Sequence, residues 1–361
     1  MIMNRLLALC TSPDQGGLEL YFLKFTRHYE KQKGFHVACS KNSYISKNID
    51  KKIECEAHGL LKTIRNFIRL RKFILQNEID WIHVSWTKDI LLGVLLKILS
   101  PRDIKIVFYR QMKLTRHKKS IYHKFIYGKV DIYLVITKKL YDDACNYLPL
   151  NKSTIHILNY GICKPNKKLS IGKKEFFNKH NIKPSMFTIG IFSRIEEQKG
   201  QHLVIEAVNK SKHEIQLCII GHCMNEKYKN KLINVAKNYD MSSLISFPGF
   251  LESPMSYMPF FDLIILPTYE ETFGLIVAEA MFMKVPVIGS NAGGVPEIIS
   301  HKFNGLLFHT KNYSDLQEKI DMIIGDSQLK EKITENGFKF VNKHYDYLSH
   351  FNKFEKLINT Y

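Results

Sequence analysis

Two glutamates stand eight residues apart in the segment PTYEETFGLIVAEAM, at Glu271 and Glu279. A carboxylate can accept hydrogen bonds from both hydroxyl groups of a sugar diol. Between the glutamates, Phe273, Gly274 and Leu275 are predicted to open a helix, whose first N–H groups lack helical acceptors and favour an anion. The segment could therefore hold two diols with a phosphate between them, which is the layout of a nucleotide sugar.

Two cations precede a second predicted helix start, in FSRIEEQKG. Arg194 and Lys199 follow an apolar run that is predicted to be a strand, and a helix is predicted from about Gly200. Fixed cations at a helix start suit a diphosphate. Either residue alone would more commonly be a solvated surface charge. The pair, in the same half of the chain as Glu271 and Glu279, favours phosphate binding.

A pair of glycines, Gly16 and Gly17, follows the first apolar run. Glycine lets the backbone approach a ligand, and a helix that starts there offers N–H groups to an anion. Paired glycines after a strand can also be a simple tight turn. The dinucleotide pattern G-x-G-x-x-G is absent, which argues against a nicotinamide enzyme.

The residues named so far follow short apolar runs that alternate with helical patterns. This alternation is typical of the α/β class, with helices wound around a parallel sheet. It occurs twice, which predicts two tandem doubly wound domains with the carboxyl ends of their strands facing a cleft. The predicted strands are 6–10, 36–40, 81–86, 104–109, 132–136 and 154–158, then 187–193, 215–221, 244–247, 262–267, 285–289 and 305–308.

The charge is concentrated in the first half of the chain. The protein carries 53 Lys and Arg against 34 Asp and Glu, but residues 1–165 hold 29 of the former and 13 of the latter. Such asymmetry predicts an anionic partner, although solubility is an alternative explanation. We find no nucleic-acid-binding module and no interleaved aromatic–basic platform, so nucleic acid is not expected. The basic segments 60–76 and 111–129 instead predict contact with an anionic membrane surface.

The sequence also bears on the compartment. It has seven cysteines, an odd number without a C-x-x-C pair, which predicts reduced thiols in a cytosolic protein. The start of the chain has no signal-peptide pattern, and the longest apolar run, 90–99, is interrupted by Lys97 and is shorter than the ~20 residues that span a bilayer. We therefore expect a cytoplasmic protein that associates peripherally with the inner face of the plasma membrane.

Several motifs together resemble one enzyme family. They are GGLE at 16–19, VDIYLVIT at 130–137, SRIEEQKG, the two glutamates with AEAM, SNAGGVPEII at 290–299 and NGLLF at 304–308. As a set they resemble the family-four retaining glycosyltransferases of GT-B fold, also called glycosyl transferases group 1. The resemblance runs over nearly the whole chain. It implies an acceptor-binding domain at 1–165 and a donor-binding domain at 166–344. The polar, Lys-rich stretch 159–184 is itself typical of a linker. The last helix, about 345–361, is expected to return to the first domain.

The resemblance assigns roles to individual residues. Arg194 and Lys199 would bind the donor diphosphate, Glu279 the ribose, and Glu271 the transferred sugar. By that division, Glu271→Gln should leave the affinity for free nucleotide almost unchanged. Further donor contacts are expected at Gly16, Gly17, Phe273, Gly274 and Leu275, and the backbone around Phe250 and Leu251 would flank the base.

The sequence departs from the family on the acceptor side. Many members have a histidine after the fourth or fifth strand of the first domain, where this chain reads FYRQMKLTRHKKS. Arg110 and Gln111 stand nearest the strand end, and His117 comes later. Either Arg110 replaces the histidine or His117 takes its place.

The implied function is retaining transfer of a hexose or N-acetylhexosamine from a UDP- or GDP-linked donor. The acceptor would be a glycan or lipid-linked glycan in lipopolysaccharide or capsule biosynthesis. The chain has no D-x-D motif and the family needs no bound metal, so neither metal nor cofactor is expected. The alternatives are a transferase with a soluble sugar acceptor, of the sucrose or trehalose synthase type, and a basic nucleic-acid-binding protein.

Overall fold

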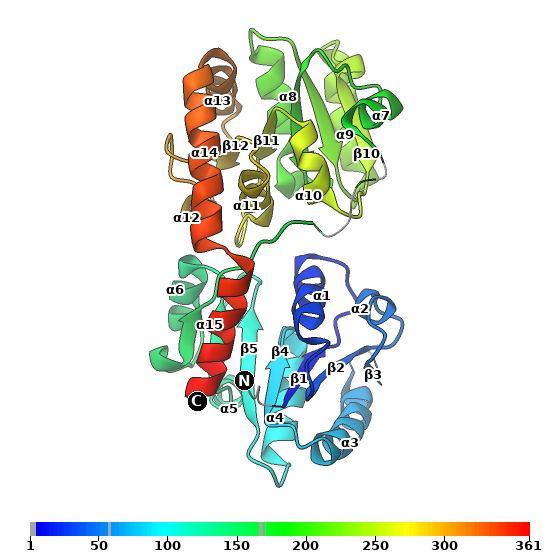
Figure 1. The fold of residues 1–361 in the computed structure, drawn as a ribbon, viewed down its shortest axis with the longest axis vertical. Coiled ribbons are helices and arrows are strands. Elements are labelled where there is room, and N and C mark those ends of the chain that lie inside the picture. The colour runs from blue at the N-terminus through cyan, green and yellow to red at the C-terminus, as the bar shows by residue number, and fades with distance from the viewer. Residues whose placement is uncertain (1–4, 57–58, 166–168, 170) are drawn as a thin grey trace. The chain divides into compact units, whose positions relative to one another are not determined.

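The computed structural model describes residues 5–56, 59–165, 169 and 171–361. The chain folds as two compact units (Figure 1). Unit 1 contains the chain up to Asn159 together with Phe351–Tyr361, and unit 2 is Tyr160–His350. The first four residues, and residues 166–168 and 170 of the predicted linker, lie outside the described residues.

Unit 1 is built on a seven-stranded parallel sheet in the order β3-β2-β1-β4-β5-β6-β7. Its buried strands are short and apolar, as in sheets covered on both faces. The strands are β1 (Leu6–Cys10), β2 (Phe35–Ser40), β3 (Ile53–Cys55), β4 (Trp81–Val84), β5 (Lys105–Arg110), β6 (Ile132–Val135) and β7 (Ile155–Ile157). The helices are α1 (Gly17–Tyr29), α2 (Tyr44–Lys47), α3 (Leu60–Gln76), α4 (Ile90–Ile98), α5 (Ile121–Tyr127) and α6 (Lys138–Tyr147).

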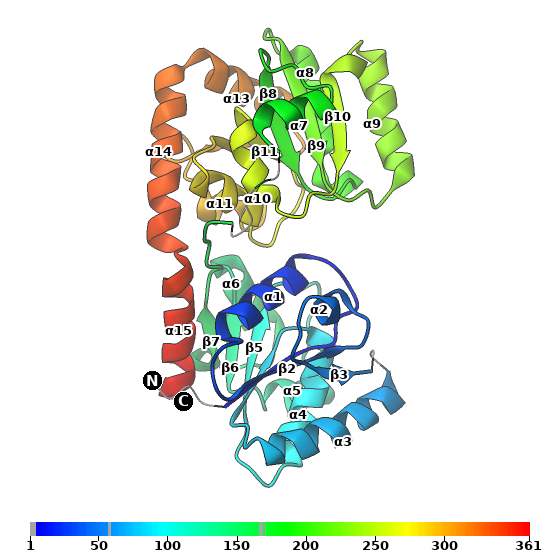
Figure 2. The same cartoon turned by 45° about the vertical axis from the view of Figure 1, so that its right-hand side comes forward.

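In unit 1, two groups of helices each pack together. Helix α4 contacts both α3 and α5, so these three helices are neighbours (Figure 2). The last helix of the chain, α15 (Tyr347–Thr360), packs through Phe351 and Phe354 on aromatic rings of α1. Phe354 meets Phe25 edge-on at 5.1 Å between ring centroids, a favourable aromatic geometry.

Unit 2 has a six-stranded parallel sheet in the order β10-β9-β8-β11-β12-β13. The order reverses beside β8, the kind of place at which open α/β sheets bind ligands. The strands are β8 (Phe187–Phe192), β9 (Ile215–Ile220), β10 (Ile245–Gly249), β11 (Leu263–Leu266), β12 (Val287–Ser290) and β13 (Leu306–Phe308). The helices are α7 (Lys173–Lys179), α8 (Gln201–Lys210), α9 (Glu226–Asn238), α10 (Pro254–Tyr257), α11 (Leu275–Phe282), α12 (Val295–Ile298), α13 (Tyr313–Gly325) and α14 (Ser327–His344).

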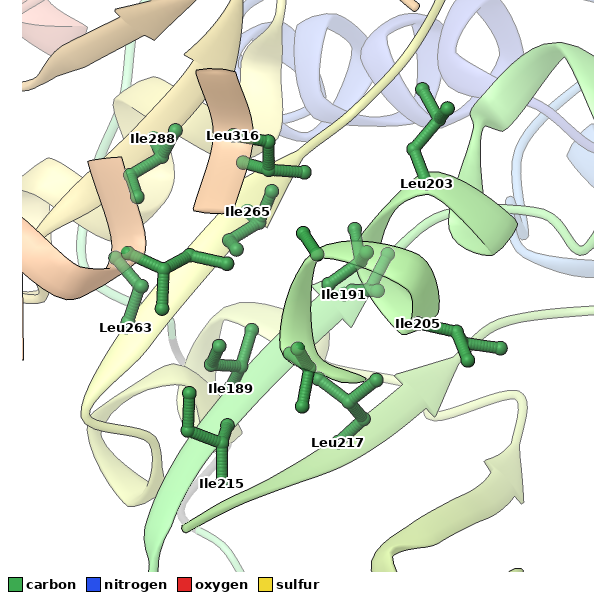
Figure 3. Close-up of a cluster of buried hydrophobic side chains, with 14 of the residues drawn as sticks. Ile189, Ile191, Leu203, Ile205, Ile215, Leu217, Leu263, Ile265, Ile288 and Leu316 are labelled. Atoms are coloured by element: carbon green, nitrogen blue, oxygen red, sulfur yellow. The ribbon is translucent and has the colours of Figure 1, made fainter. Parts of the chain in front are cut away.

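The core of unit 2 lies between this sheet and its helices (Figure 3). Ile189 and Ile191 of the central strand β8 are fully buried beside Leu263 and Ile265 of β11. Leu203 of α8 and other helix residues close the cluster. A core of this kind holds the strand ends rigidly, and the candidate site is built on the loops that follow those ends.

The predicted fold class is confirmed, since both sheets are parallel and wound with helices. The prediction missed β3, because its three residues, Ile53, Glu54 and Cys55, are too few to form an apolar run or a recognisable alternation. Strand β12 begins at Val287, two residues later than predicted. Within the described residues, no helix has the length and apolar character needed to cross a bilayer. All seven cysteines are free.

Candidate functional site

The loop after β8 carries the two predicted diphosphate ligands. Arg194 lies just beyond the strand, and Lys199 ends the short 3-10 helix η3 (Glu197–Lys199). The next residue, Gly200, has φ +67°, and a Cβ at this position would lie 2.2 Å from the carbonyl oxygen of Pro267. Glycine permits this close approach. The backbone at Lys199 is therefore fixed against the loop that follows β11.

Lys199 and Glu271 are in direct contact. Lys199 Nζ lies 3.0 Å from Glu271 Oε2, and the other carboxylate oxygen accepts the N–H of Thr272 at 3.1 Å. Arg194 instead pairs with Glu196 at 2.9 Å and is more exposed than Lys199. Two predicted site residues 72 positions apart in the chain are thus brought together in one ion pair.

The loop after β12 supports Glu271 from behind. The N–H of Gly294 donates to the carbonyl oxygen of Glu271 at 2.8 Å. Gly293 has φ +59°, and a Cβ there would lie 1.8 Å from the same oxygen. The hydroxyl of Ser290 donates to the carbonyl of Thr268 at 2.6 Å. The SNAGG part of the motif therefore serves to hold the Glu271 loop in place.

The start of α11 places the other predicted donor ligands. The helix begins at Leu275 after Gly274, so the N–H groups of the first turn point out of its amino end. The ring of Phe273 is buried and meets Tyr160 and Tyr345 edge-on, so this residue can offer a ligand only its backbone. Glu279 lies within α11 and is half-buried.

Phe250 borders a pocket at the carboxyl ends of β9 and β10. Phe250 itself is about half exposed, and Leu251 follows it in the loop to α10. The pocket has a volume of about 210 Å³, enough for a small planar group. It is lined by Ile195, Gly221, His222, Cys223, Glu226, Lys229, Phe247, Gly249 and Phe250.

A histidine that the sequence did not single out also holds the Glu271 loop. His202 Nε2 lies 2.8 Å from the hydroxyl of Tyr269, and its Nδ1 lies 2.8 Å from that of Tyr228. Burial lowers the pKa of His202, which favours the neutral ring with one donor and one acceptor. Tyr269 also donates its N–H to Gln198 at 2.9 Å. Because Tyr269 precedes Glu271 by two residues, this network positions the carboxylate.

We expect Tyr269→Phe to lower kcat with the nucleotide sugar by about fivefold, the scale of one hydrogen bond. The affinity for free nucleoside diphosphate should not fall, because Arg194 and Lys199 do not move. Tyr228→Phe, which removes the other hydroxyl from His202 without touching the loop, is the matched control. Equal losses in both variants, or a loss of free-nucleotide affinity in Tyr269→Phe, would contradict a positioning role.

In unit 1 the paired glycines open α1 as predicted. Gly16 precedes the helix and donates its N–H to Glu19 Oε2 at 2.8 Å, and Gly17 is its first residue. The other oxygen of the buried Glu19 accepts the hydroxyl of Ser12. A carboxylate of the chain therefore already occupies part of this helix start.

The three acceptor-side candidates lie in different environments. Arg110, at the end of β5, is buried and donates to Thr87 and to the carbonyl oxygens of Met112 and Lys113. Its guanidinium thus clamps the loop that follows the strand. Gln111 is also buried, whereas His117 is exposed and packs edge-on against Tyr147 at the end of α6.

Comparisons with known proteins bear on this architecture. Residues 172–340 match the family model described as glycosyl transferases group 1. The capsular polysaccharide biosynthesis glycosyltransferase CapM of Staphylococcus aureus is 24% identical over 321 residues, which cover 84% of this chain and 80% of CapM. The O-antigen biosynthesis glycosyltransferase WclY of Escherichia coli is 33% identical over 194 residues, 53% of this chain and 50% of WclY.

A solved structure shares the whole fold. Anabaena HepE in complex with UDP matches 99% of this chain and 100% of its own, with a TM-score of 0.84 at 17% identity, and it has also been solved with UDP-glucose. The fold is therefore that of the GT-B proteins. The predicted resemblance to the glycosyl transferases group 1 is confirmed, and the matched region contains Arg194, Lys199, Glu271 and Glu279.

Proposed function

We propose that this protein transfers a hexose or N-acetylhexosamine, with retention of anomeric configuration, from a UDP- or GDP-linked donor. The acceptor is a glycan or lipid-linked glycan of a cell-surface polysaccharide. The observation that carries the proposal is the contact between Lys199 and Glu271 on two fixed loops. Lys199 is the proposed ligand of the diphosphate, and Glu271 is the proposed ligand of the sugar. The names of CapM and WclY support capsule or O-antigen synthesis, and HepE, solved with UDP and UDP-glucose, supports a UDP-linked donor.

The chemistry follows from these residues. When the bond between the sugar and the diphosphate breaks, negative charge grows on the departing diphosphate. Fixed donors aimed at that charge stabilise the transition state without reorganising. Arg194, Lys199 and the amides of residues 273–275 are suited to this role, Glu279 to the ribose diol and Glu271 to the sugar hydroxyls. The pocket beside Phe250 is suited to the base.

The proposed reaction needs neither a metal nor a cofactor. The absence of a D-x-D motif from the sequence supports this. Among the residues that the structure describes, no group of three His, Cys, Asp or Glu side chains is arranged to hold a metal ion. We expect turnover to be unchanged by EDTA, and a loss of turnover that Mg²⁺ or Mn²⁺ restores would contradict a metal-independent reaction.

Isothermal titration calorimetry with UDP, GDP and ADP tests the donor class. We expect one of UDP and GDP to bind and ADP to bind more weakly. Nucleotide release from the matching nucleotide sugar should then require a lipid-linked glycan acceptor. Release with soluble sugars instead would favour a sucrose- or trehalose-type synthase, and binding of none of the three nucleotides would refute the proposed donor site.

We further propose that unit 1 docks the enzyme on an anionic bilayer, on the cytoplasmic side, where a lipid-linked acceptor would be within reach. The neighbouring helices α3, α4 and α5 support this proposal. On α3, Leu61, Ile64 and Ile68 form an exposed apolar stripe at helical spacing. From the sequence alone, apolar residues at this spacing would be expected to face the core in part.

Helix α5 presents a second exposed apolar group, Ile121, Tyr122 and Phe125, and Ile121 is 87% exposed. Residues 104–130 contain eight Lys and Arg and no Asp or Glu. An exposed apolar group in a segment whose only charged residues are basic matches an interfacial site on an anionic membrane. Each nearby Lys or Arg contributes about 1 kcal/mol to such binding, and salt screens the effect.

We expect the protein to sediment with vesicles that contain anionic lipid and not with neutral vesicles. High salt should release it. Reversing Arg116, Lys118 and Lys119 to glutamate should weaken binding by tenfold or more without changing nucleotide affinity, because none of the three is a predicted donor contact.

The matched control reverses three exposed lysines of α14 in unit 2, Lys332, Lys339 and Lys343, which gives the same change in net charge. This variant should bind anionic vesicles much better than the unit 1 variant. Equal binding of the two variants would show that net charge alone acts. Equal binding to neutral and anionic vesicles would refute the docking surface.

A further inference from the structure

The strongest unassigned feature of unit 2 is the ion pair between Lys199 and Glu271 itself. Sequence motifs give the two residues separate ligands, one the diphosphate and the other the sugar. The structure gives each residue the other as its partner, at 3.0 Å between Nζ and Oε2. The side chains are 17% and 24% exposed, so solvent screens the pair less than it screens a surface pair.

The backbones that carry Lys199 and Glu271 are each packed closely against a neighbouring loop. Gly200 sits against the carbonyl of Pro267, and Gly293 and Gly294 sit against the carbonyl of Glu271. Glu271 is further held by the N–H of Thr272. The pair is thus a built element of the loops.

We propose that Glu271 competes with the donor diphosphate for Lys199, and that this competition couples nucleotide binding to sugar binding. When the diphosphate arrives, Lys199 turns its charge to the phosphate oxygens. Glu271 loses its cation and becomes available to the hydroxyls of the transferred sugar. The inference rests on the proposed function, because it assumes a nucleoside diphosphate in this site.

The coupling has a thermodynamic consequence that differs from the expectation drawn from the motifs. A bare nucleoside diphosphate breaks the ion pair and offers Glu271 nothing in return, whereas an intact nucleotide sugar offers it hydroxyl donors. Glu271 therefore weakens the binding of free nucleotide and favours the intact donor. This also disfavours product inhibition by the released diphosphate.

Calorimetric titration with UDP, or with GDP if the wild type does not bind UDP, tests the competition. Glu271→Gln should bind the free nucleotide roughly three- to tenfold more tightly than the wild type, the scale of a partly buried ion pair. In the Lys199→Ala background, the same Glu271→Gln change should give no gain, because the residue for which Glu271 competes is gone.

The matched control is Glu197→Gln, which removes one negative charge from the same 3-10 helix as Lys199. Glu197 faces Lys231 at 3.5 Å, so nucleotide affinity should stay unchanged. Unchanged or weaker binding in Glu271→Gln would overturn the inference, and so would a gain that persists without Lys199 or appears in Glu197→Gln. Failure of the wild type to bind any nucleoside diphosphate would refute the proposed function instead.

Discussion

Arg194→Ala and Lys199→Ala are each expected to lower the rate of sugar transfer by roughly 10²-fold or more. The physical reason is the loss of one fixed cation from the charge that develops on the departing diphosphate. Arg194 is about half exposed, and Lys199 ends a short 3-10 helix outside the hydrophobic core, so the fold should survive both changes. Steady-state turnover with the nucleotide sugar measures the effect, and the melting temperature verifies the fold.

Lys210→Ala is the matched control for these two variants. Lys210 is an exposed lysine at the far end of α8, the helix that starts next to Lys199. It should keep wild-type turnover. Wild-type turnover in either Arg194→Ala or Lys199→Ala would contradict the diphosphate assignment.

Glu279→Gln is expected to weaken nucleotide binding by about 1.5–3 kcal/mol, a factor of roughly 10 to 150. The amide keeps the shape of the side chain and loses the charged acceptor for the ribose hydroxyls. Calorimetry with the free nucleoside diphosphate measures the change directly. Unlike the loss of Glu271, which should tighten binding of the free nucleotide, this loss should weaken free nucleotide and nucleotide sugar alike.

Glu318→Gln on α13 provides the control for Glu279→Gln. The Glu318 side chain is 68% exposed, and its ion-pair partner in the described part of the chain is Lys319, at 3.8 Å. Its nucleotide affinity should equal that of the wild type. If Glu279→Gln also binds nucleotide normally, then Glu279 does not hold the ribose.

The fold could be predicted well because both sheets consist of buried parallel strands, which leave apolar runs in the sequence. Of the twelve predicted strands, eleven differ from the observed strands at most by short shifts at their ends. The other, β12, starts later than predicted because Pro286 cannot donate a hydrogen bond to a neighbouring strand. Strand β3 is a three-residue edge strand that pairs only with β2, and its sequence gives no such signal.

The site could be predicted in part. Glu271 and Lys199 were identified by residue type and by their positions after strands, but their mutual contact depends on two loops from distant parts of the chain. The role of Gly293 likewise follows from a carbonyl that only the fold brings near it. His202 was missed because its two tyrosine partners lie 26 and 67 residues away.

In unit 1 the sequence could not predict which way individual side chains turn. A sequence can place Arg110 at the end of a strand, but it cannot show that the guanidinium turns back to bind Thr87 and two loop carbonyls. The apolar residues of α5 show the opposite problem. Ile121 and Phe125 would ordinarily be assigned to a core, and only their exposure in the fold marks them as a surface.

The central claim is that a sugar passes from a nucleoside diphosphate to an acceptor. Mass spectrometry of a lipid-linked glycan acceptor, incubated with the wild-type protein and in turn with UDP- and GDP-linked sugars, tests it most directly. We predict that one donor adds a single sugar residue to the acceptor, in step with release of the nucleoside diphosphate, and that Arg194→Ala loses both products. Absence of any sugar addition by the wild type, to lipid-linked and soluble acceptors alike, would contradict the account.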